Sequence, residues 1–434
     1  MAVQLKKQGP LSPHTKRMDD STPLNICLLT YRGNPTCGGQ GVYIKRLSRA
    51  LRDIGHNVDV ISGPPYPHLD DDIGLHRLQS LDLYNPKDLF RLPSFNELRS
   101  PINVMEWLSM SSGGFPEPLT FSLRAYNFFR HNGHHHYDII HDNQCLAYGL
   151  FGIRSLGYPL TATIHHPITV DRDLEVEAER KWWRKLKVHR WYSFIPMQKR
   201  AARRLSHIIT VSEASRTDIS REFGISPGKF RVVANGINTD IFHPEPGVAR
   251  EKNRLMATNS ADTPLKGLRY LLEALASIRK TRDVRLTVIG ALKEDGPIIR
   301  LVKELKLGKC VTFTGRIKDS EFAHYYAKAT IAVVPSLYEG FGLPAGEAMA
   351  CGVPVVSTTG GALPEVVGDA GVLVPPGDAG ALERAIIDLL DHPEKREQLG
   401  RAGYERVLQN FTWRATALRV AEVYREAINA HRGF

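Results

Sequence analysis

The sequence has few cysteines and no long apolar segment, and each absence excludes a class of protein. Five of the 434 residues are cysteine, an odd number, and no C-x-x-C pair occurs. The cysteines therefore argue against a disulfide framework or a zinc site and favour reduced thiols. No apolar run approaches the roughly 20 residues that span a bilayer, and the N-terminus lacks the apolar stretch of a signal peptide. We expect a cytoplasmic protein.

The composition is that of an ordinary globular protein. Hydrophobic residues make up 42% of the chain and charged residues 24%, which excludes disorder over most of its length. At roughly 100–200 residues per domain, the length predicts two or three domains, each with a sizeable core. Residues 1–22 are polar and are expected to form a flexible leader.

Acidic residues are missing from one basic segment, residues 180–204. The segment contains ten Lys or Arg and no Asp or Glu, and so accounts for nearly all of the net charge of +11. It also holds three of the five tryptophans, Trp182, Trp183 and Trp191. A partner of this segment is therefore expected to be both anionic and apolar.

Two interpretations of this basic segment remain open. Trp182, Trp183, Leu186 and Phe194 fall within about a third of a helical wheel, which favours an interfacial helix on an anionic membrane leaflet. Alternatively, the helix packs its tryptophans on the first domain and leaves its cations in solvent. Pro196 and Arg190, the latter inside the apolar arc, count against the membrane interpretation. The candidate membrane or acceptor contacts are Lys181, Trp182, Trp183, Arg184, Lys185 and Lys187.

The first half of the chain alternates short apolar runs with a helical pattern. An apolar run at 25–30, a Gly-rich loop, a helical stretch at 42–54 and a second run at 58–61 form a βαβ unit, which predicts a parallel sheet. Further strands are expected at 138–141, 160–164 and 207–211. Between residues 64 and 137 prolines are frequent and the periodicity weakens, so we expect long loops with short helices that hold a variable substrate.

A second alternating series begins near Phe230, with short strands expected at 231–234 and 255–257. Two doubly wound halves imply a cleft between them. A last helical stretch, residues 412–430, is expected to pack an apolar stripe of Leu418, Ala421, Tyr424 and Ile428 on a neighbour. The predicted divisions are 1–22, 23–225, 226–411 and 412–434.

The segment YEGFGLPAGEAMACGVPVV, residues 338–356, carries the sharpest chemical signal. Pro344 suits the first turn of a helix, which would place Glu347 in that turn and Glu339 on the preceding loop. Backbone N–H groups at such a helix N-terminus bind anions. A carboxylate beside these amides suits a sugar joined to a diphosphate. The structural alternative is a loop acid and a helix N-terminal acid stabilised by the helix dipole.

Five phrases in this order resemble the retaining glycosyltransferases of family 4, which have the GT-B fold. Besides the segment above, they are VSEASRTDISREFG, VVANGINTDIFHP, LKGLRYLLEAL and STTGGALPEVVGDAGVLVPPGD. The resemblance runs from about Asn25 to the C-terminus, except for residues 64–137. It implies an E-x7-E motif in which Glu339 faces the donor sugar and Glu347 binds the nucleotide ribose. The donor-binding residues between them are Gly340, Phe341, Gly342 and Leu343.

The resemblance also assigns roles on the other side of the cleft. The loop of Gly38, Gly39 and Gln40 would border the donor diphosphate, although alone it reads as a tight turn and lacks a full G-x-G-x-x-G. His165 follows the strand at 160–164, at the carboxyl edge where α/β ligands bind, and matches the family histidine close to the transferred sugar. We assign His166 a structural role.

Lys266 matches the family lysine that holds the leaving diphosphate, where a positioned cation stabilises developing negative charge. The arginine that the family usually has five positions earlier is missing, because that stretch reads Asn259-Ser260-Ala261-Asp262. Ser260 with Thr263, or Arg316, could replace it, or the diphosphate could bind more weakly. Residues 134–136 are histidines, but no acidic cluster accompanies them and the family needs no Asp-x-Asp clamp. We therefore expect no metal and no cofactor.

The resemblance implies two Rossmann-like domains facing a cleft and a C-terminal helix that crosses back to the first domain. The implied enzyme moves a hexosyl unit from a nucleotide diphosphate sugar, its co-substrate, to a sugar, lipid-linked or other acceptor with retention. The departing phosphate oxygen would take the acceptor proton. The alternatives are a GT-B epimerase, a phosphorylase-like enzyme, or a basic nucleic-acid-binding protein. Because only one local cluster is basic, we expect no nucleic acid and consider an anionic membrane surface at the inner face of the plasma membrane.

Overall fold

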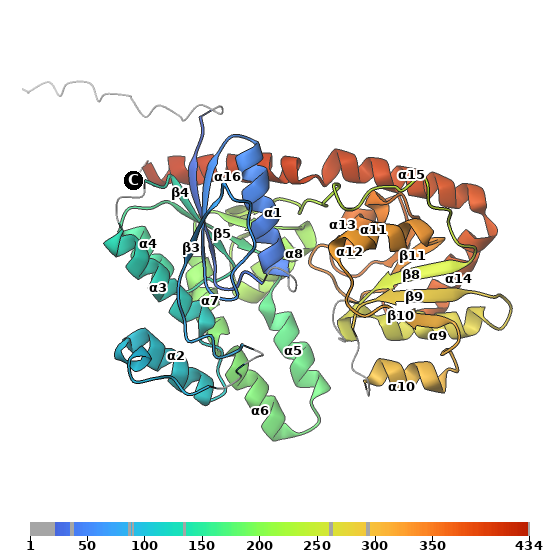
Figure 1. Cartoon of the computed structure of the whole chain (residues 1–434), viewed down its shortest axis with the longest axis horizontal. Coiled ribbons are helices and arrows are strands. Elements are labelled where there is room, and N and C mark those ends of the chain that lie inside the picture. Colours follow the sequence, from blue (N-terminus) through green and yellow to red (C-terminus); the bar gives the residue numbers. More distant parts are fainter. Residues whose placement is uncertain are drawn as a thin grey trace, which may run out of the picture.

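The computed structural model describes residues 22–34, 39–85, 88, 91–132, 136–259, 264–291 and 296–432. The predicted leader therefore lies almost wholly outside the described residues. The described chain forms two α/β domains that lie side by side, each built on a parallel sheet (Figure 1). This arrangement confirms the fold class predicted from the alternating pattern.

The first sheet has seven strands in the order β3-β2-β1-β4-β5-β6-β7, all parallel. The third strand in this order, β1, is buried on both faces: Ile26 and Leu28 pack on one side, Cys27 and Leu29 on the other. This explains why its sequence is a continuous apolar run. The strands are β1 (Asn25–Thr30), β2 (Asn57–Ser62), β3 (Gly74–Arg77), β4 (Ile139–Asn143), β5 (Leu160–Ile164), β6 (Ile208–Thr210) and β7 (Phe230–Val232).

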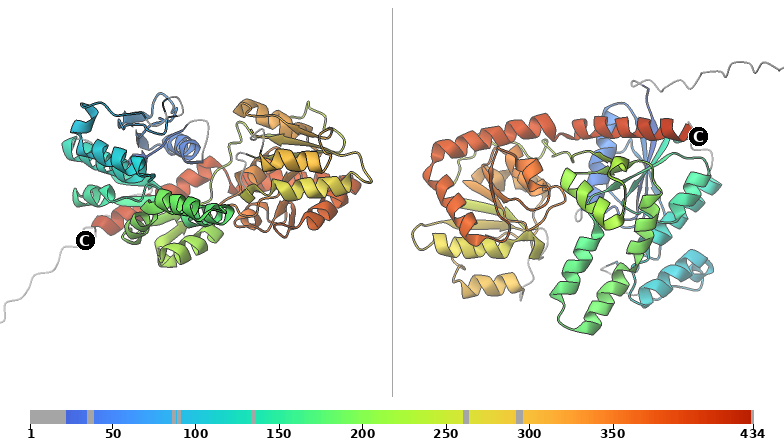
Figure 2. Two further views of the ribbon diagram at one scale, coloured as in Figure 1. Left: turned by 90° about the horizontal axis from the view of Figure 1, so that it is seen from below. Right: turned by 180° about the vertical axis from the view of Figure 1, so that it is seen from behind.

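Two helical layers cover this sheet. α1 and the C-terminal helix α16 pack together on one face, and α3, α4 and α7 cover the other (Figures 1 and 2). The helices of the first domain are α1 (Gly39–Asp53), α2 (Pro101–Ser111), α3 (Glu117–His131), α4 (Gly149–Ser155), α5 (Ile168–Ala178), α6 (Trp182–Trp191), α7 (Ile195–Arg203) and α8 (Glu213–Phe223), with 3-10 turns at Glu97–Arg99, Tyr192–Phe194 and Pro227–Lys229.

The region between residues 64 and 137 is more regular than the sequence predicts. It contains β3, α2 and a fifteen-residue α3 in place of loops with short helices. Phe121, Ala125 and Phe129 recur every four residues on α3 and are buried against the first sheet. Pro101, Pro116 and Pro118 stand at helix starts, where a missing N–H is tolerated, and so do not interrupt these helices.

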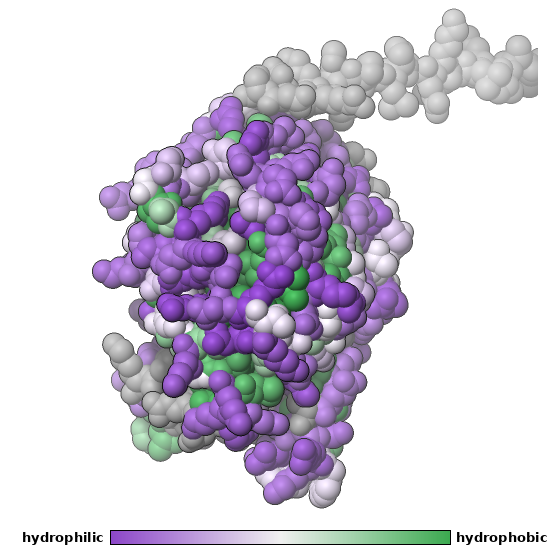
Figure 3. Space-filling model, turned by 90° about the vertical axis from the view of Figure 1, so that its right-hand side faces the viewer, coloured by the Kyte–Doolittle hydropathy of each residue, from purple (hydrophilic) through white to green (hydrophobic). Residues whose placement is uncertain are grey.

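The second sheet has six parallel strands in the order β10-β9-β8-β11-β12-β13. They are β8 (Arg254–Thr258), β9 (Arg285–Ile289), β10 (Val311–Phe313), β11 (Ile331–Val334), β12 (Val355–Thr358) and β13 (Val372–Val374). Its helices are α9 (Leu268–Ile278), α10 (Pro297–Glu304), α11 (Asp319–Lys328), α12 (Leu343–Ala350), α13 (Leu363–Val367), α14 (Ala379–Asp391) and α15 (Pro393–Asn410), with a 3-10 turn at Pro264–Lys266. The face of this domain that points away from the first is largely hydrophilic (Figure 3).

One strand belongs to a different sheet from the one predicted. β7 pairs with β6 through Phe230 and Arg231, so it completes the first sheet and does not begin the second. The first sheet therefore extends past residue 225, the predicted end of the first domain. The sequence predicts a short strand here, but the neighbours of a strand depend on tertiary packing and do not follow from the apolar residues of the strand alone.

The C-terminal helix α16 (Trp413–Arg432) crosses back to the first domain, as expected (Figure 1). Ala421, Tyr424 and Ile428 are buried beside Leu24 of the first domain. Leu418 is exposed, which corrects the predicted apolar stripe: it lies roughly 100° around the helix from the buried face. Within the described ranges, every helix is too short or too polar to cross a membrane.

Candidate active site

The loop between β11 and α12 carries the predicted catalytic carboxylate. Glu339 Oε1 accepts hydrogen bonds from Lys266 Nζ at 2.7 Å and from Ser336 Oγ at 2.8 Å. Both charged side chains are largely buried, with exposed fractions of 12% for Glu339 and 23% for Lys266. The structure therefore brings together two residues that are 73 positions apart in the sequence.

The helix after this loop begins one residue earlier than predicted. α12 starts at Leu343, with Gly342 as its N-cap at φ +106°, a left-handed conformation that favours glycine. Pro344 is the second helical residue, and Glu347 is the fifth, so Glu347 does not lie in the first turn. Phe341 is buried edge-on against Phe411, with ring centroids 5.8 Å apart.

The loop that carries Glu339 touches the histidine loop of the first domain at Gly340. A Cβ at this position would lie 3.0 Å from the carbonyl oxygen of His165 and 3.2 Å from Cβ of His166. Such contacts are tighter than ordinary packing, so a larger residue would push the two loops apart. Gly340, the residue after Glu339, therefore meets His165 at the interface between the two domains.

Hydrogen bonds fix both the position and the tautomer of His165. Its backbone N–H donates to Gln144 Oε1 at 2.8 Å, and its Nε2 lies 2.9 Å from Asn143 Oδ1. Asn143 uses its Nδ2 to donate to the carbonyl oxygen of Gln40, so its oxygen faces the histidine and Nε2 must be the donor. The Tyr43 ring packs edge-on against the imidazole at 4.6 Å.

Burial, and secondly the charge of His166, lowers the pKa of His165 to about 3. The imidazole is therefore neutral at neutral pH. His166 pairs with Asp171 across 2.6 Å, as suits the structural role predicted for it.

The Gly-rich segment lies at the start of α1. Gly39 and Gln40 are its first two residues, whereas Gly38 lies outside the described residues. Gln40 is connected to His165 through Asn143, which places the segment beside the histidine loop. The next glycine, Gly41, is needed for close approach, because a Cβ there would lie 2.1 Å from the carbonyl oxygen of Asn34.

The replacement for the family arginine stays open. Ser260, Ala261 and Thr263 lie outside the described residues. Arg316 follows β10, which is separated from β8 by β9. Of the histidine run, His134 and His135 are not described, and no three metal-binding side chains gather among the residues that are.

Several residues of the site were not predicted. Asn143 and Gln144 hold His165, and Ser212 and Ser215 contact the loop of Glu339 at Gly340. A signal for the first pair was present, because polar residues follow the apolar run of β4 directly. Gln144 also adopts a positive φ of 58°, and its side-chain Nε2 donates to the carbonyl oxygen of His166.

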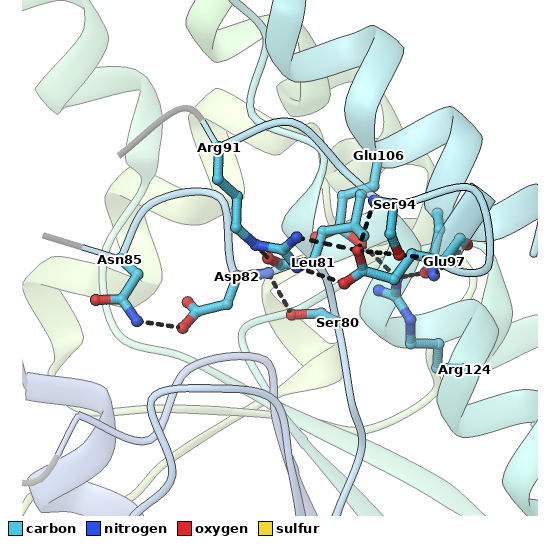
Figure 4. Close-up of polar contacts among 10 residues, drawn as sticks. Ser80, Leu81, Asp82, Asn85, Arg91, Ser94, Glu97, Glu106 and Arg124 are labelled. Carbon is cyan, nitrogen blue, oxygen red and sulfur yellow. Dashed lines mark hydrogen bonds and ion pairs between the residues drawn. The ribbon is translucent and has the colours of Figure 1, made fainter. Parts of the chain in front are cut away.

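A partly buried cluster of polar side chains lies near the carboxyl ends of β1 and β2, beside residues 80–85 and 91–97. Arg124 hydrogen bonds to Glu106, and Arg91 binds Glu97 with two nitrogens (Figure 4). The adjoining cavity has room for about one water molecule and is lined by Tyr31, Gly63, Pro64, Leu78, Ser80, Glu106, Glu117, Thr120, Phe121 and Arg124. Burial raises the pKa of Glu117 to about 8.

The first helix of the basic segment, α6, forms an arm together with the preceding helix α5, and this arm projects from the first domain (Figures 1 and 2). No residue of α6 is buried. Trp182 is 73% exposed, Leu186 57% and Trp183 40%. Three cations lie near the Trp183 ring: Lys181 at 5.9 Å, Arg184 at 5.2 Å and Lys187 at 5.1 Å.

The base of the arm behaves differently from its tip. The Trp191 ring stacks on Phe115 at 5.1 Å and meets Tyr84 at 5.3 Å. Phe194 packs against Phe115, and Arg190 donates to Ser112 Oγ at 2.6 Å. The interpretation that the segment packs on the first domain is therefore right for Trp191 and Phe194, whereas Trp182 and Trp183 are accessible to solvent.

Comparison with known proteins finds two family models along the chain. Residues 37–241 match Glycosyltransferase Family 4, and residues 241–406 match Glycosyl transferases group 1. The MMP alpha-(1->4)-mannosyltransferase of Mycolicibacterium hassiacum is 46% identical over 93% of this chain and 98% of its own length. A D-inositol 3-phosphate glycosyltransferase of Pseudarthrobacter chlorophenolicus is 27% identical over 99% of this chain and 97% of its own.

Two solved structures have a similar arrangement of both domains. The sucrose-phosphate synthase of Thermosynechococcus elongatus is 26% identical, with a TM-score of 0.71 over 94% of this chain and all of that chain (100%). Anabaena HepE in complex with UDP is 20% identical, with a TM-score of 0.66 over 92% of this chain and 99% of that chain. The second likeness bears on the fold alone.

Proposed function

Because the chain belongs to glycosyltransferase family 4 and is a nucleotide-sugar hexosyltransferase with the GT-B fold, we propose that it transfers a mannosyl unit in α linkage. The 46% identical mannosyltransferase supports mannose as the sugar and a sugar acceptor with a free 4-hydroxyl group. The donor would be a nucleotide diphosphate mannose, and transfer would proceed with retention.

The ion pair of Lys266 and Glu339 carries this proposal. Breaking the bond between sugar and diphosphate develops negative charge on the leaving oxygens, and Lys266 is the cation assigned to stabilise it. The Glu339 carboxylate, held by Ser336 and Lys266, would accept hydrogen bonds from the sugar hydroxyls. The backbone amides of Phe341, Gly342 and Leu343, at the start of α12, would bind the diphosphate, and Glu347 the ribose.

A neutral His165 suits the other face of the transferred sugar. The transition state carries positive charge at the anomeric carbon, which a cationic imidazolium would oppose. Burial keeps the imidazole uncharged, so it can offer a hydrogen-bonding atom without repulsion. We assign no separate general base, because the departing phosphate oxygen can take the acceptor proton. Gly38, Gly39 and Gln40 would border the diphosphate on this side.

We also propose that the tip of the α5–α6 arm contacts an anionic membrane surface at the inner face of the plasma membrane. Exposed tryptophans surrounded by cations are typical of interfacial segments. Each cation near an anionic leaflet contributes about 1 kcal/mol, and Lys181, Arg184, Lys185 and Lys187 lie within two turns of the exposed rings. The projection of the arm in Figures 1 and 2 supports this role, since the tip can reach a flat surface.

Thermal unfolding with a panel of nucleotides and nucleotide sugars tests the donor proposal. A ligand at 100 times its dissociation constant stabilises the folded protein by about 2.7 kcal/mol, which is easily detected. We expect one nucleotide series to raise the unfolding temperature, and Glu339→Gln to reduce the extra shift given by the sugar. Conversion of the nucleotide sugar without an acceptor would favour an epimerase. No shift with any member of the panel would contradict the proposal.

A further inference from the structure

We propose that the first turn of α8 positions the donor loop against His165, with Ser212, Ser215 and Glu365 as positioning residues for transfer. The inference rests on the proposed roles of Glu339 and His165. It assigns a function to helix α8, which belongs to the first domain but holds a loop of the second.

Two serine hydroxyls join the domains at a single carbonyl group. Ser212 Oγ donates to the carbonyl oxygen of Gly340 at 2.7 Å. Ser215 Oγ lies 2.9 Å from the same oxygen and 3.1 Å from the carbonyl oxygen of His165. Both serines are buried. The Ser215 hydroxyl is therefore shared between the donor loop and the histidine loop.

Helix capping explains only part of this arrangement. Ser212 is the N-cap of α8 and accepts from the Ser215 backbone N–H at 3.0 Å, which leaves its own proton free to reach Gly340. Ser215 lies in the first turn, where a buried hydroxyl needs a partner because an unpaired one is costly. The carbonyl groups of Gly340 and His165 satisfy this need.

A carboxylate of the second domain fixes the same turn from another side. Glu365 on α13 accepts from the backbone N–H groups of Glu213 and Ala214, each at 2.8 Å. These are two of the N–H groups that a helix cannot satisfy internally, and the helix dipole favours a carboxylate there. One turn further along, Tyr338 donates its hydroxyl to Asp218 Oδ2 at 2.8 Å.

These contacts bracket the proposed catalytic carboxylate. Tyr338 and Gly340, the residues on either side of Glu339, are both held by α8. The direction of the Glu339 side chain therefore depends on how the first domain sits against the second. The second domain could therefore still bind the donor when the Glu339 side chain is misaligned for transfer. A misalignment of about 1 Å can lower a reaction rate on the order of 100-fold.

Steady-state kinetics on four variants test the proposal. We expect Ser212→Ala and Ser215→Ala to lower kcat by about 10-fold to 100-fold while the dissociation constant of the free nucleotide changes less than about twofold. Ser212→Thr keeps both the cap and the donated proton and should restore kcat. Asp378→Ala is the matched control, because Asp378 caps α14 by accepting from Ala381 N and lies outside this contact. It should lower the unfolding temperature and leave kcat unchanged.

Two outcomes would overturn the proposal. If the wild-type protein is active and both alanine variants have the same kcat as the wild type, the serines have only a structural role and the proposed function stands. Loss of nucleotide affinity in proportion to kcat would assign them to binding.

If the wild-type protein shows no turnover, the proposed function fails, and small-angle X-ray scattering then decides on the domain contact. The triple variant Ser212→Ala, Ser215→Ala, Glu365→Ala should have a larger radius of gyration than the wild type. An unchanged radius would overturn the inference independently.

Discussion

The charge states of a few buried side chains determine what the proposed site can do. Burial lowers the pKa of both His165 and His141 to about 3, so both imidazoles are neutral at neutral pH. His141 lies between Tyr424 and Thr163, with its Nδ1 2.5 Å from the Tyr424 hydroxyl oxygen. Thr163 is in turn 3.3 Å from the Tyr43 hydroxyl, whose ring packs on His165. Three polar contacts and one ring contact therefore connect Tyr424 of α16 to His165.

Glu117 gives a residue-scale prediction with a definite sign. Burial raises its pKa to about 8, although Arg32 lies 3.2 Å away. The carboxyl group then binds its proton more tightly in the folded than in the unfolded protein, so wild-type stability falls as pH rises from about 4.5 to 8, by up to about 1.4 kcal/mol per pH unit. Glu117→Gln removes this loss. Chemical denaturation should therefore show the free energy of unfolding of the variant rising relative to that of the wild type between pH 5 and pH 8.

Glu97→Gln is the matched control for this experiment. Hydrogen bonds from Arg91 and Ser94 lower the pKa of Glu97 to about 2, the opposite direction (Figure 4). The Glu97 carboxylate stabilises the folded state above its unfolded pKa, so the control variant should lose stability relative to the wild type as pH rises through the acid range. A Glu117→Gln difference that is independent of pH would contradict the raised pKa.

Which site residues can be read from the sequence depends on where their partners lie. Glu339, Glu347 and Lys266 stand in recognisable phrases, and the structure brings Glu339 and Lys266 into contact. Ser215 could not be singled out, because its partners His165 and Gly340 are 50 and 125 positions away and only the packed domains bring them together. The sequence phrases identify side chains that are expected to bind the donor, whereas the hydrogen bonds that join the two domains can be found only in the structure.

At the scale of elements, the α5–α6 arm is an example of a pattern that local sequence described only in part. The cations and exposed tryptophans of α6 follow from composition. The helical wheel placed Phe194 with Trp182 and Trp183, but α6 ends at Trp191 and a 3-10 turn follows, which directs Phe194 into the aromatic cluster of the first domain. The end of a helix changes which residues share a face, and that end carries no capping signal here.

Vesicle co-sedimentation tests the arm directly. We expect the wild-type protein to bind vesicles containing anionic lipid more strongly than neutral vesicles, with binding that weakens as salt increases. Trp182→Ala with Leu186→Ala should reduce the bound fraction severalfold through lost apolar contact. Lys185→Gln with Lys187→Gln should weaken the preference for anionic lipid, because two of the four cations near the exposed rings are neutralised.

Leu408 and Leu418 provide the matched control for the arm. Both are exposed leucines on other helices, at 44% and 46%, so their replacement by alanine should leave vesicle binding unchanged. If the arm variants bind vesicles as the wild type does but raise the KM for the acceptor, the tip contacts the acceptor sugar. Unchanged vesicle binding in all of the arm variants would contradict the membrane role.

At the scale of the whole molecule, the chain crosses between the two domains at two places that lie next to each other, near Ile237 and near Phe411. The backbone N–H of Ile237 donates to the carbonyl oxygen of Phe411 at 2.6 Å, just before α16 returns to the first domain. Ile237 and Thr412 form an isolated parallel bridge at this crossing. The alternation of strands and helices predicted two such domains, and the family resemblance implied the returning helix. The alternation did not predict that β7 belongs to the first sheet, because strand order is set by packing between segments far apart in the sequence.

The anomeric configuration of the transferred sugar is the most direct test of the proposed activity. The donor selected by thermal unfolding would be incubated with the protein and a mannose oligosaccharide that has a free 4-hydroxyl group, and the product followed by proton NMR. We predict a new α-linked mannosyl unit, formed from an α-linked donor, with the rate reduced on the order of 100-fold or more in Glu339→Gln. A β-linked product, or full activity in Glu339→Gln, would contradict the account.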